Sequence, residues 1–156
     1  MRIGVISDTH GSMQAIQKAV QAAEQVELWL HAGDYSQDGE VLSSLTGAKV
    51  IAAKGNCDGC AKAKIDEFIQ IGKVKIWITH GHRYGVKHDD KELLWWGREF
   101  EANVVIYGHT HIPDCRWVEN ILIFNPGSAA QPRFGNGTFG ILEIDGEKVQ
   151  AHTLEI

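Results

Sequence analysis

The stretch RIGVISDTHG, residues 2–11, decides the fold, because a short apolar run leads directly into a cluster of polar residues. Ser12 follows, and apolar side chains then recur at near-helical spacing from Met13 to Ala23. The pattern predicts a strand, a polar loop and a helix in that order. The polar residues of the loop would therefore lie where the strand ends.

The same unit is repeated in the next part of the chain. Residues 28–33 form a second apolar run, and Val41 to Leu45 predict a short helix that ends near Gly47. Residues 49–53 form a third apolar run. The resulting order of strands and helices is typical of a parallel sheet with helices on its faces.

The pattern changes after residue 66. Residues 67–71 and 74–79 flank Gly72-Lys73, which predicts an antiparallel hairpin. We expect Asp89 to cap a helix that carries Leu93 to Phe100, with Glu92 in the capping-box position. A strand should follow at residues 104–107. Four short strands are expected at residues 115–118, 121–124, 137–144 and 149–154, with Asp145-Gly146 as the last turn. The sequence predicts a single α/β domain over residues 1–156, a four-layer sandwich of two mixed β-sheets flanked by helices.

Composition excludes several classes of protein. The chain has 156 residues, of which 44% are hydrophobic and 22% charged, values near the globular average that exclude disordered and coiled-coil proteins. The net charge of -5 argues against general nucleic-acid binding. No apolar run approaches the ~20 residues of a membrane span. Three cysteines without framework spacing suit a reducing compartment, so we expect a cytoplasmic protein. From the charge and the short apolar runs, we expect neither a nucleic-acid nor a membrane partner.

Five polar clusters each follow a predicted strand. Ligands bind at the carboxyl ends of strands in α/β sheets, so these clusters should converge. Their carboxylate, imidazole and amide groups suit Mn²⁺, Fe²⁺, Ni²⁺ or Zn²⁺, and they are too many for one ion. Asp8 and His10 lie two residues apart, as do His109 and His111, so extended backbone would project each pair to one side. The five clusters are Asp8-Thr9-His10-Gly11, Gly33-Asp34, Gly55-Asn56-Cys57-Asp58, Thr79-His80-Gly81-His82 and Gly108-His109-Thr110-His111. Two metal ions that share a bridging carboxylate would use a ligand set of this size.

The set of clusters, in this order, resembles the calcineurin-like metallophosphoesterases, in their small uncapped phosphodiesterase subgroup. The resemblance covers nearly the whole chain, including Asn125-Pro-Gly-Ser128. It implies that one metal is held by Asp8, His10 and His111, and the other by Asn56, His80 and His109. Asp34 would bridge them. It also implies a metal-dependent phosphodiesterase that breaks the P–O bond of a small phosphate ester by in-line attack of a hydroxide bridging two divalent metals, with Mn²⁺ as the expected ion.

The sequence departs from the larger family at Cys57, where many relatives have a histidine that is taken to assist the leaving group. A thiol with a reference pKa near 8.5 is a poorer donor to an alkoxide, and such a group contributes roughly 10²–10⁴-fold in rate. His82 could replace it. The same substitution resembles what the small phosphodiesterase subgroup carries. Arg83 and Arg133 are candidates for binding a phosphate oxygen through the guanidinium group.

Two other functions remain open. The resemblance extends to the retromer scaffold subunit of this fold, a non-catalytic binding module whose metal pocket has decayed, whereas here all seven ligand positions are filled. A phosphomonoesterase or pyrophosphatase would share the same site and differ in substrate.

Several further residues are expected to have structural roles. We expect His31 in the core, and His88 and His152 on the surface. Cys57 and Cys60 lack the second pair of ligands that a zinc site needs. Ser128 has no evident partner base, so it is better interpreted as part of a turn than as a nucleophile. An exposed Trp95 would be a candidate homodimer contact.

Overall fold

The first sheet is built on three parallel strands. The computed structural model describes residues 1–156. Its first three strands are β1 (Arg2–Ile6), β2 (Leu28–His31) and β3 (Lys49–Ala52). The C-terminal strands β9 (Thr138–Asp145) and β10 (Lys148–Glu155) add to the β1 edge in antiparallel orientation. The strand order is β10-β9-β1-β2-β3, so the two ends of the chain are brought into one sheet.

The second sheet also has a parallel centre with antiparallel edges. Its strands are β4 (Asp66–Ile71), β5 (Val74–Thr79), β6 (Val104–Ile106), β7 (Asp114–Val118) and β8 (Ile121–Asn125). Strands β5, β6 and β8 are parallel, and the strand order is β4-β5-β6-β8-β7. The predicted hairpin is confirmed, because Ile71 pairs with Val74 across Gly72-Lys73.

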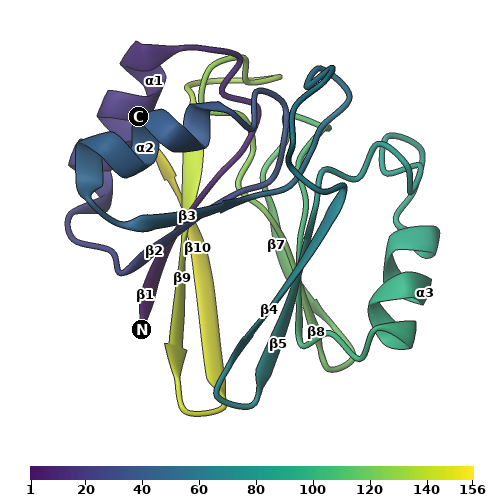
Figure 1. Ribbon diagram of the computed structural model, residues 1–156. Coiled ribbons are helices and arrows are strands. Elements are labelled where there is room, and N and C mark those ends of the chain that lie inside the picture. Colours follow the sequence, from purple (N-terminus) through teal and green to yellow (C-terminus); the bar gives the residue numbers. More distant parts are fainter.

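The two sheets pack face to face, with helices outside (Figure 1). Helices α1 (Met13–Ala23) and α2 (Asp38–Thr46) cover the first sheet, and α3 (Lys91–Glu99) covers the second. A cluster of 15 buried residues, including Val5, Ile78 and Phe124, lies between the sheets. Trp29 is buried beneath α1 and α2, and Trp77 beneath α3. The predicted four-layer architecture is confirmed, and no helix is long and apolar enough to cross a membrane.

The ends of the helices follow some local signals and not others. Ser12 caps α1 by accepting a hydrogen bond from the backbone N–H of Ala15 (3.3 Å), and Gly47 ends α2 in the left-handed region. The capping box predicted for Asp89 and Glu92 is wrong. Helix α3 begins at Lys91, and the Asp89 carboxylate accepts a hydrogen bond from the Lys91 N–H (3.0 Å), a local turn that leads into the helix.

The turn of the last hairpin is shifted by one residue from its predicted position. Asp145 pairs with Lys148 in the ladder, so the turn consists of Gly146 and Glu147. Gly146 has φ +62°, a left-handed conformation suited to the first turn position of a tight hairpin.

Candidate metal centre

Loops from both sheets meet at one end of the molecule, where the parallel strands have their carboxyl ends (Figure 1). This placement brings six of the seven predicted ligands together in two groups. The first group is Asp8, His10, Asp34 and His111; the second is Asp34, His80 and His109. Within each group the candidate ligand atoms lie within 4.8 Å of one another, a spacing at which they could hold a metal ion. Asp34 belongs to both groups.

The backbone at these residues is left-handed rather than extended. The φ angles are +53° at Asp8, +45° at His10, +68° at His109 and +59° at His111. The prediction that extended backbone projects each pair to one side is therefore wrong. Tight turns place Asp8 and His10 in one group and separate His109 from His111. Because such conformations cost about 1–3 kcal/mol each, they persist only where the surrounding contacts fix them.

Each carboxylate has one oxygen held by the protein and one directed at the imidazoles. Asp8 Oδ2 accepts hydrogen bonds from the Ser7 hydroxyl (2.6 Å) and the His109 N–H (3.2 Å). Asp8 Oδ1 is buried without a hydrogen bond and lies 3.0 Å from His111 Nε2. Asp34 Oδ1 accepts a hydrogen bond from the Cys57 N–H (2.8 Å), and Asp34 Oδ2 lies 3.3 Å from His80 Nε2.

Backbone carbonyls set the orientation of two imidazoles. His80 Nδ1–H donates to the carbonyl of Ala32 (2.8 Å), and His111 Nδ1–H donates to that of Gln131 (2.6 Å). This orientation directs each Nε2 at the carboxylates. His10 Nε2 is buried and makes no hydrogen bond. Buried polar atoms without hydrogen-bond partners are rare, so the unpaired atoms Asp8 Oδ1 and His10 Nε2 fit a site at which both would be ligands of a cation.

The charges at the site suit a cation as well. Burial alone would raise the pKa of Asp34, but its hydrogen bond and charge interaction with His80 hold that pKa well below the usual range. Asp8 is likewise held below its usual pKa, against the effect of burial, by His111 and His80. Burial and the neighbouring His80 lower the pKa of His109 to about 4. At neutral pH both carboxylates are therefore ionised and His109 is neutral, as metal binding requires. The hydrogen bond with Asp8 raises the pKa of His111, and Asp34 and Asp8 raise that of His80 against the effect of burial, so a cation binding there would compete with protons.

Two glycines allow the loops to approach the carboxylates closely. A Cβ at Gly55 would lie 2.2 Å from Asp34 Oδ1. A Cβ at Gly108 would lie 2.0 Å from the Ser7 hydroxyl and 2.8 Å from Asp8 Oδ2. Neither position has room for a side chain, so the glycines of these clusters serve the packing of the site.

The remaining predicted site residues surround the two groups. Asn56 is exposed, and its Nδ2 donates to Cys57 Sγ (3.4 Å). The ring of His82 lies 5.5 Å from that of His80, between centroids, and its Nδ1 is buried without a hydrogen bond. Arg83 follows directly and is exposed. Arg133 is also exposed, and its backbone N–H donates to the carbonyl of His111 (3.2 Å), which places it beside the first group.

Other residues near the site have structural roles. Ser128 is fully buried; its hydroxyl donates to the Asp8 carbonyl (2.8 Å) and accepts from the Gln131 N–H (2.8 Å), in agreement with its interpretation as part of a turn. The Asp58 carboxylate accepts hydrogen bonds from the N–H groups of Gly55 and Ser36 (2.6 Å each), which fixes the loop that carries Asn56.

The remaining histidines lie where they were expected. His31 is fully buried, and His88 and His152 are exposed. No sequence pattern pointed to two other residues near the site, Thr9 and Asp38, which are joined by a hydrogen bond (2.6 Å) across 29 residues of chain.

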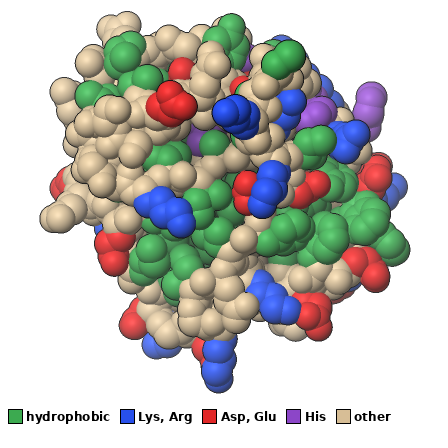
Figure 2. Space-filling model, in the orientation of Figure 1, with side chains coloured by type: hydrophobic (Ala, Val, Ile, Leu, Met, Phe, Trp, Pro, Cys, Tyr) green, Lys and Arg blue, Asp and Glu red, His purple; other side chains and the backbone are tan.

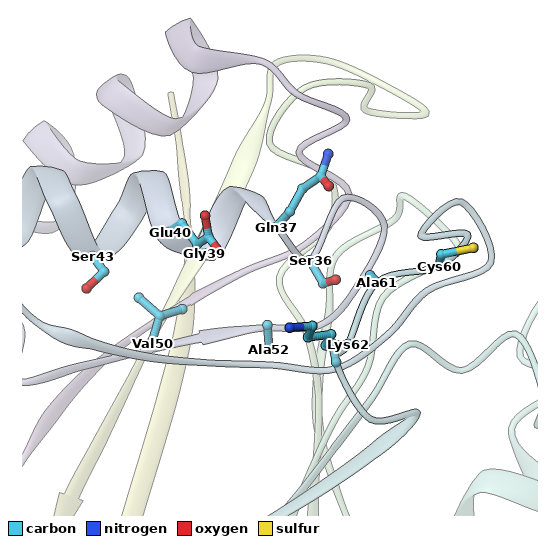
Figure 3. Close-up of a pocket in the computed structure, with 11 residues that line it drawn as sticks. Ser36, Gln37, Gly39, Glu40, Ser43, Val50, Ala52, Cys60, Ala61 and Lys62 are labelled. Carbon is cyan, nitrogen blue, oxygen red and sulfur yellow. The ribbon is translucent and has the colours of Figure 1, made fainter.

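A cavity of about 520 Å³ lies apart from the two groups, between α2, the edge strand β3 and the loop at residues 60–63 (Figure 3). Its lining includes Ser36, Glu40, Cys60 and Lys62. None of these residues belongs to either group of candidate ligands. The candidate metal centre is therefore formed by the loops themselves and not by this cavity.

Comparisons with known proteins agree with the geometry. A family model described as the calcineurin-like phosphoesterase superfamily domain matches residues 1–147. A "Probable metallophosphoesterase" of Methanocaldococcus jannaschii is 42% identical over 163 residues, which cover 100% of this chain and 82% of that protein. A phosphodiesterase of the same organism is 34% identical over 177 residues, which cover 99% of this chain and 100% of that protein. The crystal structure of a predicted phosphoesterase from Streptococcus pneumoniae matches with a TM-score of 0.84 and 29% identity, covering 99% of this chain and 88% of its own.

Proposed function

Because this chain belongs to the calcineurin-like phosphoesterase superfamily and is a phosphoesterase hydrolase, we propose that it hydrolyses phosphodiesters with two divalent cations bound at the candidate metal centre. The observation that carries the proposal is the position of Asp34, which belongs to both groups of candidate ligands. A carboxylate shared in this way is suited to bridging two ions. We assign Asp8, His10 and His111 to one cation, and His80, His109 and the amide oxygen of Asn56 to the other.

When bound, the cations would acidify a water for attack on phosphorus and offset the charge of the phosphoryl oxygens. The chain prepares the site for them. Its two carboxylates stay ionised, and the carbonyls of Ala32 and Gln131 hold the rings of His80 and His111 with Nε2 directed at those carboxylates. Oxygen and nitrogen donors without thiolate suit Mn²⁺, the ion we propose, and also Ni²⁺, Fe²⁺ and Zn²⁺.

The groups at the edge of the site are assigned to the substrate. The exposed guanidinium groups of Arg83 and Arg133 can each bind phosphate oxygens through two N–H donors. We assign protonation of the leaving group to His82. Burial and the neighbouring His80 lower the pKa of His82, so its protonated form is a stronger acid than that of an ordinary histidine. Desolvation and the Asp34 carboxylate raise the pKa of the Cys57 thiol to about 11, which makes it a weak proton donor.

The cellular setting follows from the cysteines. Cys57, Cys60 and Cys115 are all free thiols. Free and exposed thiols persist in a reducing compartment, so we place the enzyme in the cytoplasm. Its substrate is then a small phosphodiester of that compartment.

The proposal is tested with metal-stripped protein titrated with Mn²⁺, using bis(p-nitrophenyl) phosphate as the diester and p-nitrophenyl phosphate as the monoester. We expect diester turnover that depends on Mn²⁺. Asp34→Asn should lose both metal binding and turnover, by roughly 10²-fold or more, the effect of removing one charge-stabilising group from an active site. Asp145→Asn, at the exposed end of β9, should retain both.

Other outcomes favour the alternatives. Retention of metal and activity by Asp34→Asn would overturn the bridging assignment. Faster turnover of the monoester would indicate a phosphomonoesterase. Mn²⁺ binding without any turnover would indicate a non-catalytic scaffold of the same fold.

A further inference from the structure

A buried carboxylate outside the two ligand groups holds both neighbours of His10. Asp38 lies in the first turn of α2 and is only 7% exposed. Its Oδ2 accepts hydrogen bonds from the Thr9 hydroxyl (2.6 Å) and the Gly11 N–H (2.9 Å). The residues immediately before and after His10 are therefore held by one atom.

The contacts continue from Thr9 to the loop that carries Asp34. The single hydroxyl proton of Thr9 is donated to Asp38, so Thr9 Oγ1 accepts from His31 Nε2–H (2.9 Å). His31 Nδ1 in turn accepts from the Gly33 N–H (3.1 Å), next to Asp34. We call the chain of contacts from Asp38 through Thr9 and His31 to Gly33 the Asp38 network. It joins the loops that follow β1 and β2.

The network lies at a left-handed segment of backbone. His10 has φ +45°, and Gly11 has φ +75°. A non-glycine residue in this region tends to relax towards φ < 0, which would redirect its side chain. His10 Nε2 is also buried without a hydrogen bond, so no hydrogen bond of its own fixes that atom.

We propose that Thr9 and Asp38 are positioning residues for the metal ligand His10, acting through the Asp38 network. This inference rests on the proposed function, because it assumes that His10 binds a cation. The network touches neither the candidate ligand atoms nor the cavity of Figure 3, so it acts through the backbone, and the two contacts of Asp38 flank His10. Contacts of this kind around a metal site typically change affinity by about 10- to 100-fold.

The test compares Mn²⁺ binding by metal-stripped variants in isothermal titration calorimetry. Thr9→Val keeps the shape of the side chain and removes the hydroxyl; we expect the affinity of one of two Mn²⁺ sites to fall about 10- to 100-fold while the other is nearly unchanged. Thr9→Ser keeps the hydroxyl and should bind as the wild type does. Asp38→Ala should resemble Thr9→Val. Glu40→Gln, on the same helix and exposed, is the matched control and should have no effect.

Thermal unfolding of the same metal-free variants separates positioning from stability. If Thr9→Val and Asp38→Ala unfold at lower temperature but bind both Mn²⁺ ions with wild-type affinity, the network is only structural and the inference is overturned. Equal weakening at both sites would also overturn it. If the wild-type protein itself binds no Mn²⁺, the proposed function fails first and the inference fails with it. The result for Thr9→Val decides the question even if Asp38→Ala does not fold.

Discussion

The hydroxyl of Ser128 donates a 2.8 Å hydrogen bond to the backbone carbonyl of Asp8, across 120 residues of sequence. The same oxygen accepts from the N–H of Gln131, whose carbonyl orients His111. One buried hydroxyl thus connects two candidate ligands of the same group.

Ser128→Ala should weaken the fold and the site together. It leaves the buried carbonyl of Asp8 and the partly buried N–H of Gln131 without this partner, which costs about 1–3 kcal/mol of unfolding free energy. Urea unfolding measures that loss, and titration with Mn²⁺ measures the weaker binding we expect. Ser44→Ala, on the exposed side of α2, is the control and should change little. Loss of catalysis with stability and metal binding intact would contradict this structural assignment.

Gly55→Ala should abolish metal binding, because its Cβ would collide with the Asp34 carboxylate and backbone. We expect loss of Mn²⁺ binding and of diester turnover, measured on the same preparation. Gly59→Asn is a matched control in the same loop, since the space around Gly59 is open and asparagine tolerates its left-handed conformation. Normal binding by Gly55→Ala would show that the loop can move away without affecting the site.

His31 should make the metal-free protein sensitive to mild acid. Burial lowers the pKa of His31 to about 4 in the folded chain, from an ordinary value of 6.5. Below pH 6.5 the unfolded chain takes up this proton first, so stability is complete above pH 6.5 and falls as the pH approaches 4. The loss between about pH 7 and pH 5 should be about 2 kcal/mol.

The measurement for His31 is urea unfolding at both pH values, on the wild type and on His31→Gln. The variant removes one titrating group, so its stability should fall less over this interval. Equal losses in the two proteins would contradict the assignment.

Cys57→His should help poor leaving groups more than good ones. A histidine at this exposed position is a better proton donor than a thiol with a pKa of about 11. We expect a larger rise in kcat for an alkyl diester than for the p-nitrophenyl diester, measured in parallel. A similar change in both would indicate that leaving-group protonation does not depend on this residue.

Trp95 should take part in self-association. Its side chain on α3 is 51% exposed, and hydrophobic side chains gather on the α3 side of the face in Figure 2. If Trp95 is a homodimer contact, sedimentation velocity should detect a dimer that Trp95→Glu converts to monomer. Phe134→Glu, at the most exposed large hydrophobic residue, is the control. A wild-type protein that stays monomeric at high concentration would exclude this contact.

The sequence predicted the fold and the ligand clusters because both depend on local pattern. Short apolar runs followed by Asp, His or Gly predicted the strands and the loops that meet at their ends, and Asp8 and Asp34 lie at this edge of the sheets. The errors concern details that the apolar pattern does not encode. Helix α3 starts at Lys91 because of a local turn at Asp89, and the left-handed backbone of His10 requires support that no neighbouring residue reveals.

The residues that hold the ligands were harder to predict. Thr9 meets Asp38 across 29 residues, and the pairing of Ser128 with Asp8 spans most of the chain. Neither pair forms a motif of fixed spacing, because the two partners become neighbours only after the sheets have formed. The chemistry of a site can thus be visible in a sequence while its supports are not.

Each group of candidate ligands draws on both sheets. Asp34 follows β2 of the first sheet, whereas His80 and His109 follow β5 and β6 of the second. Neither sheet can assemble a complete set of donors alone, so hydrolytic activity should require both sheets to be folded and packed together. A truncated or incompletely folded chain that lacks one sheet should therefore have no hydrolytic activity, so that activity reports on the completeness of the fold.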